Sequence, residues 1–333
     1  MNNSSHLKPA GKAIFQDRYT KKAGELLTPW EEGLKGEVAI IGAPLSKSSI
    51  SHSGALFAPD TIRKCLQSYT TYSIEQDEDY RNVTMVDFGD VLMHPTSIVE
   101  SQNRIYESVK TVVNEGAAPF TVVLGGDHSI STSSIEAIAE SKGKIGVIQF
   151  DAHHDLRNVE DGGPTNGTPF RRLLERGVID GENLVQIGIR DYSNSRAYYE
   201  YALEQGVTVK TMKDVREKGM SHLIDEALRL LEDKVDLIYL SVDMDVLDQA
   251  FAPGCPAIGP GGMDSYTLME AVSTACRHPK VQAMDIVEID PTLDIRDMTS
   301  RIAAHLLLKV LNSAPALVLG TTRNMSKMSN QQE

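Results

Sequence analysis

Three short stretches of the chain concentrate side chains that could bind metal ions. They read GGDHS at 125–129, DAHHD at 151–155 and SVDMD at 241–245. If these stretches meet in space, their carboxylates would repel one another and raise one another's pKa values, so the cluster would need a compensating cation. Carboxylate oxygens combined with two imidazoles suit Mn²⁺, Fe²⁺ or Zn²⁺, whereas all-oxygen sites favour Mg²⁺ or Ca²⁺. No cysteine lies in the cluster, which argues against a structural thiolate zinc site.

A pair of divalent ions would give this cluster hydrolytic chemistry. Two ions about 3.5–4 Å apart can share a bridging water and lower its pKa towards neutrality, which provides a nucleophilic hydroxide at physiological pH. Such a nucleophile attacks a planar, polar centre. The residues alone leave amide, phosphate, guanidine and amidine substrates open.

The order of residues in DAHHD separates its two histidines. In an extended chain alternate side chains share a face, so Asp151, His153 and Asp155 are expected on one side and His154 on the other. We therefore predict that His153 faces the metal ions, and that His154 packs against or supports the site. By the same argument the last two aspartates of SVDMD lie together.

Short apolar runs typical of buried β-strands precede each of these stretches and recur along the chain. Segments with helical spacing of apolar residues lie between them, for example at 97–114, 221–232 and 299–311. This alternation predicts a largely parallel sheet with helices on both faces. In such sheets ligands bind outside the carboxyl ends of the strands, where the three polar stretches fall. The eight expected strands are 38–41, 83–88, 121–124, 145–150, 184–189, 207–210, 237–242 and 283–289.

Composition and charge bound the class of protein. The chain has 333 residues, of which 41% are hydrophobic and 24% charged, with a net charge of −13. It should therefore fold, and it should have no general attraction for nucleic acid or anionic membranes. Three cysteines without a CxxC pair favour a reducing compartment. Without a signal-peptide run or a stretch of 18 apolar residues, we expect a cytoplasmic protein with no membrane span.

Together the three motifs resemble the signatures of the ureohydrolase superfamily, which includes arginase, agmatinase and formimidoylglutamase. The likeness covers nearly the whole chain, from VAIIGAP at 38–44 through IVEIDP at 286–291 to the last helical segment. It implies a single ureohydrolase domain over residues 1–333, with a core of about 36–312 and polar, peripheral termini. The implied fold is α/β: three layers, α/β/α, around an eight-stranded, mostly parallel sheet.

The resemblance also implies a binuclear manganese site with two Mn²⁺ per subunit. One ion would be held by His128, Asp151, Asp155 and Asp243, and the other by His153, Asp151, Asp243 and Asp245, so that Asp151 and Asp243 bridge. In addition, Glu288 matches the acidic residue of the superfamily that faces the cationic nitrogens of the substrate.

Within the superfamily, the stretches at 151–170 and 241–262 are most similar to the formimidoylglutamase group. These enzymes hydrolyse N-formimidoyl-L-glutamate to L-glutamate and formamide in histidine degradation. Arg157 stands where arginase has an asparagine that contacts the substrate's α-carboxylate, and an arginine can grip a carboxylate with two hydrogen bonds. The alternative for this arginine is an ion pair with Glu160 or Asp161.

Two further positions differ from arginase in ways that bear on the reaction. Ser193 stands where arginase has an aspartate for the substrate's free amine, and its loss fits a nitrogen that carries the formimidoyl group. Asn166 stands where relatives have a histidine that shuttles protons. Because an amide cannot carry a proton in this way, we predict that Asn166 orients the substrate by hydrogen bonds.

Other functions stay open at this point. The nearest alternative is a guanidino-acid hydrolase or an agmatinase-like enzyme that releases urea. A more remote one is a catalytically silent subunit that binds an amino acid. The resemblance further implies a homo-oligomer, a trimer or a hexamer, that acts on a small molecule rather than on nucleic acid or a membrane.

Overall fold

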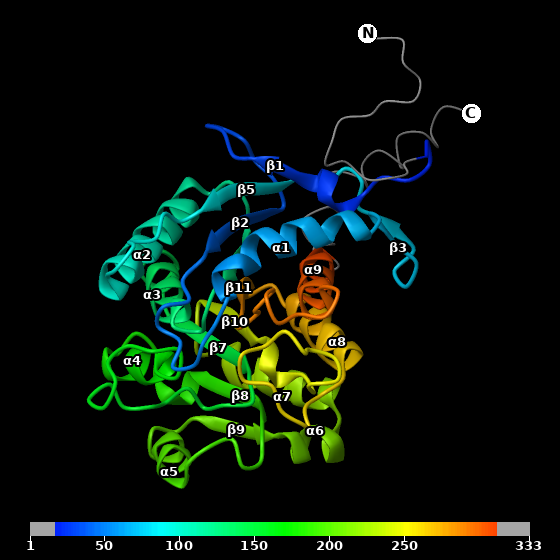
Figure 1. The fold of residues 1–333 in the computed structure, drawn as a ribbon. Coiled ribbons are helices and arrows are strands. Elements are labelled where there is room, and N and C mark those ends of the chain that lie inside the picture. Colours follow the sequence, from blue (N-terminus) through cyan, green and yellow to red (C-terminus); the bar gives the residue numbers. More distant parts are fainter. Residues whose placement is uncertain (1–16, 312–333) are drawn as a thin grey trace.

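The computed structural model describes residues 17–311, and a nine-stranded sheet forms the centre of this part of the chain (Figure 1). All neighbouring strands in it are parallel. Every run expected as a strand is one, and the predicted α/β class is confirmed. In sheet order the strands are β1 (Leu27–Pro29), β5 (Met85–Asp90), β2 (Val38–Ala43), β6 (Phe120–Gly125), β11 (Val281–Val287), β10 (Leu237–Asp243), β7 (Ile145–Phe150), β8 (Leu184–Ile189) and β9 (Thr208–Thr211).

The ninth strand, β1, was not expected from the sequence. It is three residues long, is not fully buried and pairs only with β5 at one edge of the sheet. Its sequence, LTP, contains no apolar run, so its position depends on the neighbouring strand rather than on its own pattern. A separate antiparallel pair, β3 (Tyr72–Ser73) and β4 (Glu78–Asp79), lies outside the main sheet.

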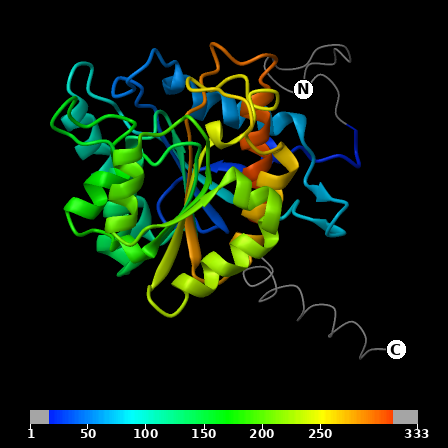
Figure 2. The same cartoon turned by 90° about the horizontal axis from the view of Figure 1, so that it is seen from below.

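Helices cover both faces of the sheet, as Figure 2 shows. Each layer packs on its own hydrophobic core. The three segments with helical spacing are all helical. One layer contains α2 (Ile98–Glu115), α3 (Ile130–Lys142), α4 (Pro169–Glu175) and α5 (Arg196–Glu204); the other contains α1 (Ala58–Cys65), α6 (Met212–Lys218), α7 (Met220–Leu231), α8 (Ser265–Cys276) and α9 (Met298–Leu311).

The central strands are largely apolar because both of their faces are covered. In β2, Ile40 contributes to the core beneath α1 and α7–α9, and its neighbour Ile41 contributes to the core beneath α2–α4. Val122 and Val123 of β6 divide in the same way. Alternate residues of a strand point to opposite faces, so two buried faces favour a nearly continuous apolar run.

The order of the strands places the polar stretches side by side. Strands β6, β11, β10 and β7 are consecutive neighbours in the sheet, and their carboxyl ends lead to GGDHS, Glu288, SVDMD and DAHHD. The parallel arrangement brings all four ends to the same edge of the sheet. No helix within residues 17–311 is long and apolar enough to span a bilayer.

Candidate metal centre

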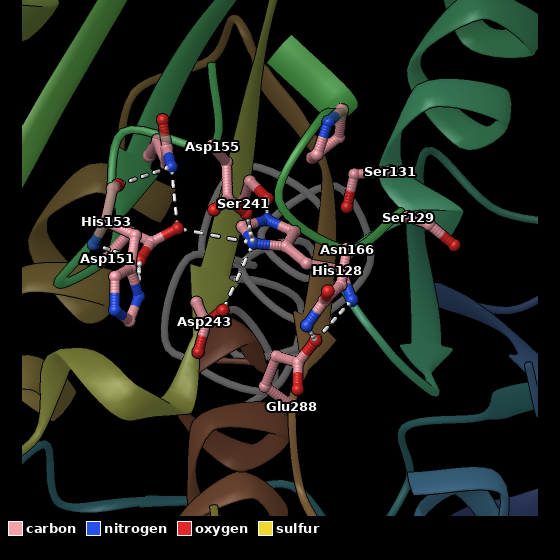
Figure 3. A network of polar contacts seen from close by, with 12 residues as sticks. His128, Ser129, Ser131, Asp151, His153, Asp155, Asn166, Ser241, Asp243 and Glu288 are labelled. Carbon is pink, nitrogen blue, oxygen red and sulfur yellow. Dashed lines mark hydrogen bonds and ion pairs between the residues drawn. The ribbon is translucent and has the colours of Figure 1, made fainter. Parts of the chain in front are cut away.

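His128 lies among three carboxylates. It is buried between the end of β6 and the start of α3. Its Nδ1 is 2.7 Å from Asp155 Oδ2, 3.1 Å from Asp243 Oδ2 and 3.2 Å from Asp151 Oδ2 (Figure 3). These four side chains offer ligand atoms close enough together to hold one metal ion. Their residues are those that the resemblance assigns to the first ion.

A second group of possible ligands lies next to the first and shares Asp151 with it. His153 Nδ1 is 2.9 Å from Asp245 Oδ2 and 3.5 Å from Asp151 Oδ1. Asp245 is buried, whereas His153 is partly open to solvent. The charge of Asp245 raises the pKa of His153 to about 12. Asp243, expected as a second bridge, belongs to the first group alone in this geometry.

The backbone of DAHHD is not a continuation of the strand. Strand β7 ends at Phe150, and Asp155 has a φ of 53°, in the left-handed region. The expected separation of the histidines is nevertheless present. His154 is buried, and its Nδ1 lies 2.7 Å from Gln186 Oε1 instead of near the carboxylates. The bend in the backbone after β7, and not strand alternation, therefore places His153 beside the carboxylates and His154 away from them.

Asn194 fixes this turn. Its Oδ1 accepts a hydrogen bond from the His154 backbone N–H at 2.9 Å, and its Nδ2 donates to the Ala152 carbonyl at 2.9 Å. Arg190 supports the neighbouring strand end, because its guanidinium donates to the backbone carbonyls of Asp245 and Leu247. Both side chains therefore hold the backbone beside the cluster.

Two buried glutamines orient Asp151. Gln149 Nε2 donates to Asp151 Oδ2 at 2.7 Å, and Gln186 Nε2 donates to Gln149 Oε1 at 2.7 Å. The other oxygen of Asp151 accepts the His153 backbone N–H at 2.6 Å. Each carboxylate oxygen of this aspartate is thus held by a donor before any ligand binds.

The carboxylates around His128 would be stabilised by a bound cation. Burial lowers the pKa of His128, but the charges and hydrogen bonds of Asp155, Asp151 and Asp243 outweigh it and raise the pKa well above the ordinary value. Burial, together with the charges of Asp245 and Asp151, raises the pKa of Asp243 well above its usual range. A divalent cation among these groups would relieve the repulsion and give Nδ1 of His128 a partner. The donor set therefore fits a metal ion.

Glu288 lies beside this cluster with one oxygen held and the other without a partner. It follows β11 and has a φ of 60°. Its Oε1 accepts the His128 backbone N–H at 2.8 Å and Asn166 Nδ2 at 3.0 Å, while its buried Oε2 has no hydrogen-bond partner in the described part of the chain. Burial and the charge of Asp127 raise the pKa of Glu288 to about 8. A cationic group would stabilise this carboxylate.

Asn166 contacts Glu288 and the segment that carries Ile50. Its Oδ1 accepts the Ile50 backbone N–H at 3.0 Å, and its Nδ2 donates to Glu288 and, at 3.4 Å, to Ser49 Oγ. The amide is therefore engaged with the protein on both sides. Direct orientation of the substrate by Asn166 stays a prediction; the structure shows a hydrogen bond from this amide to Glu288.

A cavity of about 420 Å³ is lined by most of the expected site residues, whereas His128 and Asp151 lie behind its surface and do not line it. Tyr198 and Ser195 also line this cavity and were not expected from the sequence. Asn158 Nδ2 donates to the hydroxyl oxygen of Tyr198 at 3.3 Å, which leaves the tyrosine's own proton available. Of the expected residues, the cavity is lined by His153, Asp155, Arg157, Asn166, Ser193, Asp243, Asp245 and Glu288.

Arg157 is exposed at this cavity, and its side chain makes no ion pair or hydrogen bond within residues 17–311. The alternative ion pair with Glu160 or Asp161 is not formed. Asn158 holds the loop instead, because its Oδ1 accepts hydrogen bonds from the backbone N–H groups of Glu160 and Asp161. The Arg157 guanidinium therefore keeps its donors for another partner. Ser193 is partly buried and lies on the same cavity.

Comparisons with known proteins show what the chain is similar to in sequence and in fold. A sequence model described as the arginase family matches residues 36–312. A formimidoylglutamase of Halalkalibacterium halodurans is 59% identical over 90% of this chain and 94% of its own. The crystal structure of a formimidoylglutamase from Bacillus subtilis superimposes with a TM-score of 0.89 at 51% identity, over 92% of this chain and 96% of the other. A human mitochondrial guanidino acid hydrolase is 32% identical, over 85% of this chain and 79% of its own.

Proposed function

The chain belongs to the arginase family, and from this premise we propose that it hydrolyses N-formimidoyl-L-glutamate to L-glutamate and formamide. It is a hydrolase that acts on an amidine. One observation carries the choice of substrate. One cavity combines ligand atoms for a metal ion, the buried carboxylate of Glu288 and the Arg157 guanidinium, which has no partner among residues 17–311. The similarity to two formimidoylglutamases supports the same choice.

We further propose that the cluster holds two Mn²⁺, which activate a water molecule when bound. The ligands of one ion would be His128, Asp151, Asp155 and Asp243, and those of the other would include His153, Asp151 and Asp245. The family resemblance adds Asp243 to the second set, although the geometry groups Asp243 with the first ion alone. Oxygen and imidazole donors without thiolate support manganese among the divalent ions.

The residues of the chain itself bind and orient the substrate. Glu288 Oε2 accepts hydrogen bonds from the amidinium nitrogens, because it is the unsatisfied acceptor beside the cluster. Arg157 binds a carboxylate of the glutamate portion, and Ser193 hydrogen-bonds near it. Water supplies the oxygen of formamide, the bond between the amidine carbon and the glutamate nitrogen breaks, and that nitrogen leaves as an amine.

A substrate panel tests this function. Purified protein loaded with Mn²⁺ is expected to release formamide from N-formimidoyl-L-glutamate, to lose this activity when the metal is chelated and to regain it when Mn²⁺ is returned. Formamide and urea are measured separately. Faster release of urea from 4-guanidinobutyrate would instead identify a guanidino-acid hydrolase, which the similarity to the human enzyme makes the second candidate. Absence of turnover on every amidine and guanidine would identify a silent binding subunit.

The family resemblance supports three broader proposals. The reaction belongs to histidine degradation, it takes place in the cytoplasm, and the chain works as a homo-oligomer, a trimer or a hexamer. Light scattering coupled to size-exclusion chromatography measures the last of these directly, and a monomeric mass would contradict it.

Arg157→Gln is expected to raise KM for N-formimidoyl-L-glutamate roughly tenfold with a smaller effect on kcat. A charge-assisted hydrogen bond contributes about 1.5–3 kcal/mol when buried, and the exposure of this side chain reduces that value. Steady-state release of formamide measures the change. Hydrolysis of formamidine, which has no carboxylate, should not change. The matched control is Glu160→Gln, an exposed charge on the same loop that does not line the cavity. An unchanged KM in Arg157→Gln would contradict the assignment.

A further inference from the structure

Ser241 and Asp285 connect His128 to the interior of the sheet. They are opposite each other on the neighbouring strands β10 and β11, and both are fully buried. His128 Nε2 lies 2.9 Å from Ser241 Oγ, and Ser241 Oγ lies 2.8 Å from Asp285 Oδ1. The two bonds form a continuous path that ends at the imidazole nitrogen remote from the carboxylate cluster.

The direction of these hydrogen bonds follows from the donors around Asp285. Its Oδ1 also accepts the Val242 backbone N–H at 3.3 Å, and an N–H group can only donate. Its Oδ2 accepts the hydroxyls of Ser131 at 2.6 Å and Tyr239 at 2.9 Å. Asp285 is therefore surrounded by donors, and the hydroxyl hydrogen of Ser241 points towards it.

This direction determines which nitrogen of His128 carries hydrogen. Because the single hydrogen of Ser241 is used on Asp285, its oxygen can only accept from His128, so Nε2 carries the N–H. In the neutral imidazole Nδ1 then has the lone pair. Nδ1 is the atom that faces Asp151, Asp155 and Asp243, and the neighbours within 3.2 Å of it are carboxylate oxygens, which offer it no hydrogen to accept.

We propose that Ser241, directed by Asp285, is a positioning residue that holds the hydrogen of His128 on Nε2 and so reserves Nδ1 for a metal ion. This inference rests on the metal site of the proposed function but not on its substrate. The opposite tautomer would place an N–H among the carboxylates and could not ligate through Nδ1. Loss of the partner that fixes a ligating histidine typically lowers metal affinity roughly 10- to 100-fold.

Ser241→Ala is the first test. Titration of Mn²⁺ into chelator-treated protein, followed by calorimetry and by the electron paramagnetic resonance of free Mn²⁺, is expected to show one weakened site, by roughly 10- to 100-fold. The group that contains His153 and Asp245 should keep its affinity. The ¹⁵N spectrum of histidine-labelled, Zn²⁺-loaded wild-type protein should show His128 with hydrogen on Nε2.

Ser131→Ala is the matched control. Ser131 is equally buried and donates to the same carboxylate, but its hydroxyl bonds the other oxygen. Its contact with His128 is a backbone N–H to carbonyl hydrogen bond of 3.1 Å, which the substitution keeps and which does not involve the imidazole. If the serines act only by filling the interior and satisfying Asp285, both variants will lose metal affinity to the same extent. Equal losses, or unchanged affinity in Ser241→Ala, would overturn the inference.

A double-mutant cycle tests the role of Asp285. Asp285→Ala frees the Ser241 hydroxyl to donate to His128 and so favours the wrong tautomer, with a loss of affinity at least as large as that of Ser241→Ala. The double variant should lose no more than the larger single loss, because Asp285 acts through Ser241. Additive losses would contradict this order of action. Wild-type protein that binds no Mn²⁺ would overturn the inference, whereas binding without release of formamide would overturn only the substrate.

Discussion

Asp151→Asn is expected to reduce release of formamide by at least about three orders of magnitude, which corresponds to roughly 4 kcal/mol of lost transition-state stabilisation. Asp151 is the one residue shared by both groups of possible ligands. Its two oxygens already accept from Gln149 Nε2 and from the His153 backbone N–H. An amide in this place must turn its NH₂ group towards one of these donors. The substitution therefore removes a negative charge and also opposes the geometry of the loop.

Metal content separates these effects from unfolding. Asp151→Asn protein should contain fewer metal ions per chain than wild type when measured by mass spectrometry, and its circular dichroism spectrum should be preserved. Asp225→Asn is the control, because this aspartate is exposed on α7 and belongs to neither group. A variant that kept full metal content and full activity would show that Asp151 is not a shared ligand.

The strands of this fold can be predicted from the sequence because a strand that is buried on both faces is a short, nearly continuous run of apolar residues. The eight expected strands were each short apolar runs, and both faces of the central ones are covered by helices. Strand β1 has no such run, since only pairing with β5 at the edge of the sheet defines it. Residues that owe their conformation to a neighbouring segment leave no periodic pattern in their own sequence.

The sequence also contains a signal for the residues that orient the cluster. Gln149, Gln186, Ser241 and Asp285 are polar residues within largely apolar strands, and all four are fully buried. A buried polar side chain must find a hydrogen-bond partner, so a lone polar residue in such a run indicates a specific contact. The sequence therefore shows where such polar residues are, but it does not show their hydrogen-bond partners, which lie on other strands.

The turn at 151–155 shows where local reasoning was insufficient. Strand alternation predicted the correct grouping of its side chains, yet the backbone leaves the strand before Asp151 and reaches a left-handed conformation at Asp155. Asn194, which holds this turn, lies some forty residues along the chain. This contact forms because β7 and β8 are neighbours in the sheet, and the sequence of residues 151–155 alone contains no information about that pairing.

Glu288→Gln is expected to lower kcat/KM for N-formimidoyl-L-glutamate by roughly 100- to 1,000-fold, or about 3–4 kcal/mol. The amide oxygen can replace Oε1 and keep the donors from His128 and Asn166. The NH₂ group would then replace the unpartnered Oε2 and point a donor at a cationic amidinium, which adds repulsion to the loss of an ion pair. Steady-state kinetics of formamide release measures this effect.

Metal binding distinguishes this role from a disturbance of the cluster. Glu288 belongs to neither group of possible ligands, so Glu288→Gln should bind Mn²⁺ with wild-type affinity while turnover falls. Asn166→Ala should give an intermediate loss, because Glu288 then keeps the His128 N–H and loses one of its two donors. Full turnover in Asn166→Ala would exclude this amide from the reaction. A parallel fall of metal affinity and turnover in Glu288→Gln would assign the carboxylate to the metal site instead of the substrate, since only a substrate contact can change one quantity and leave the other.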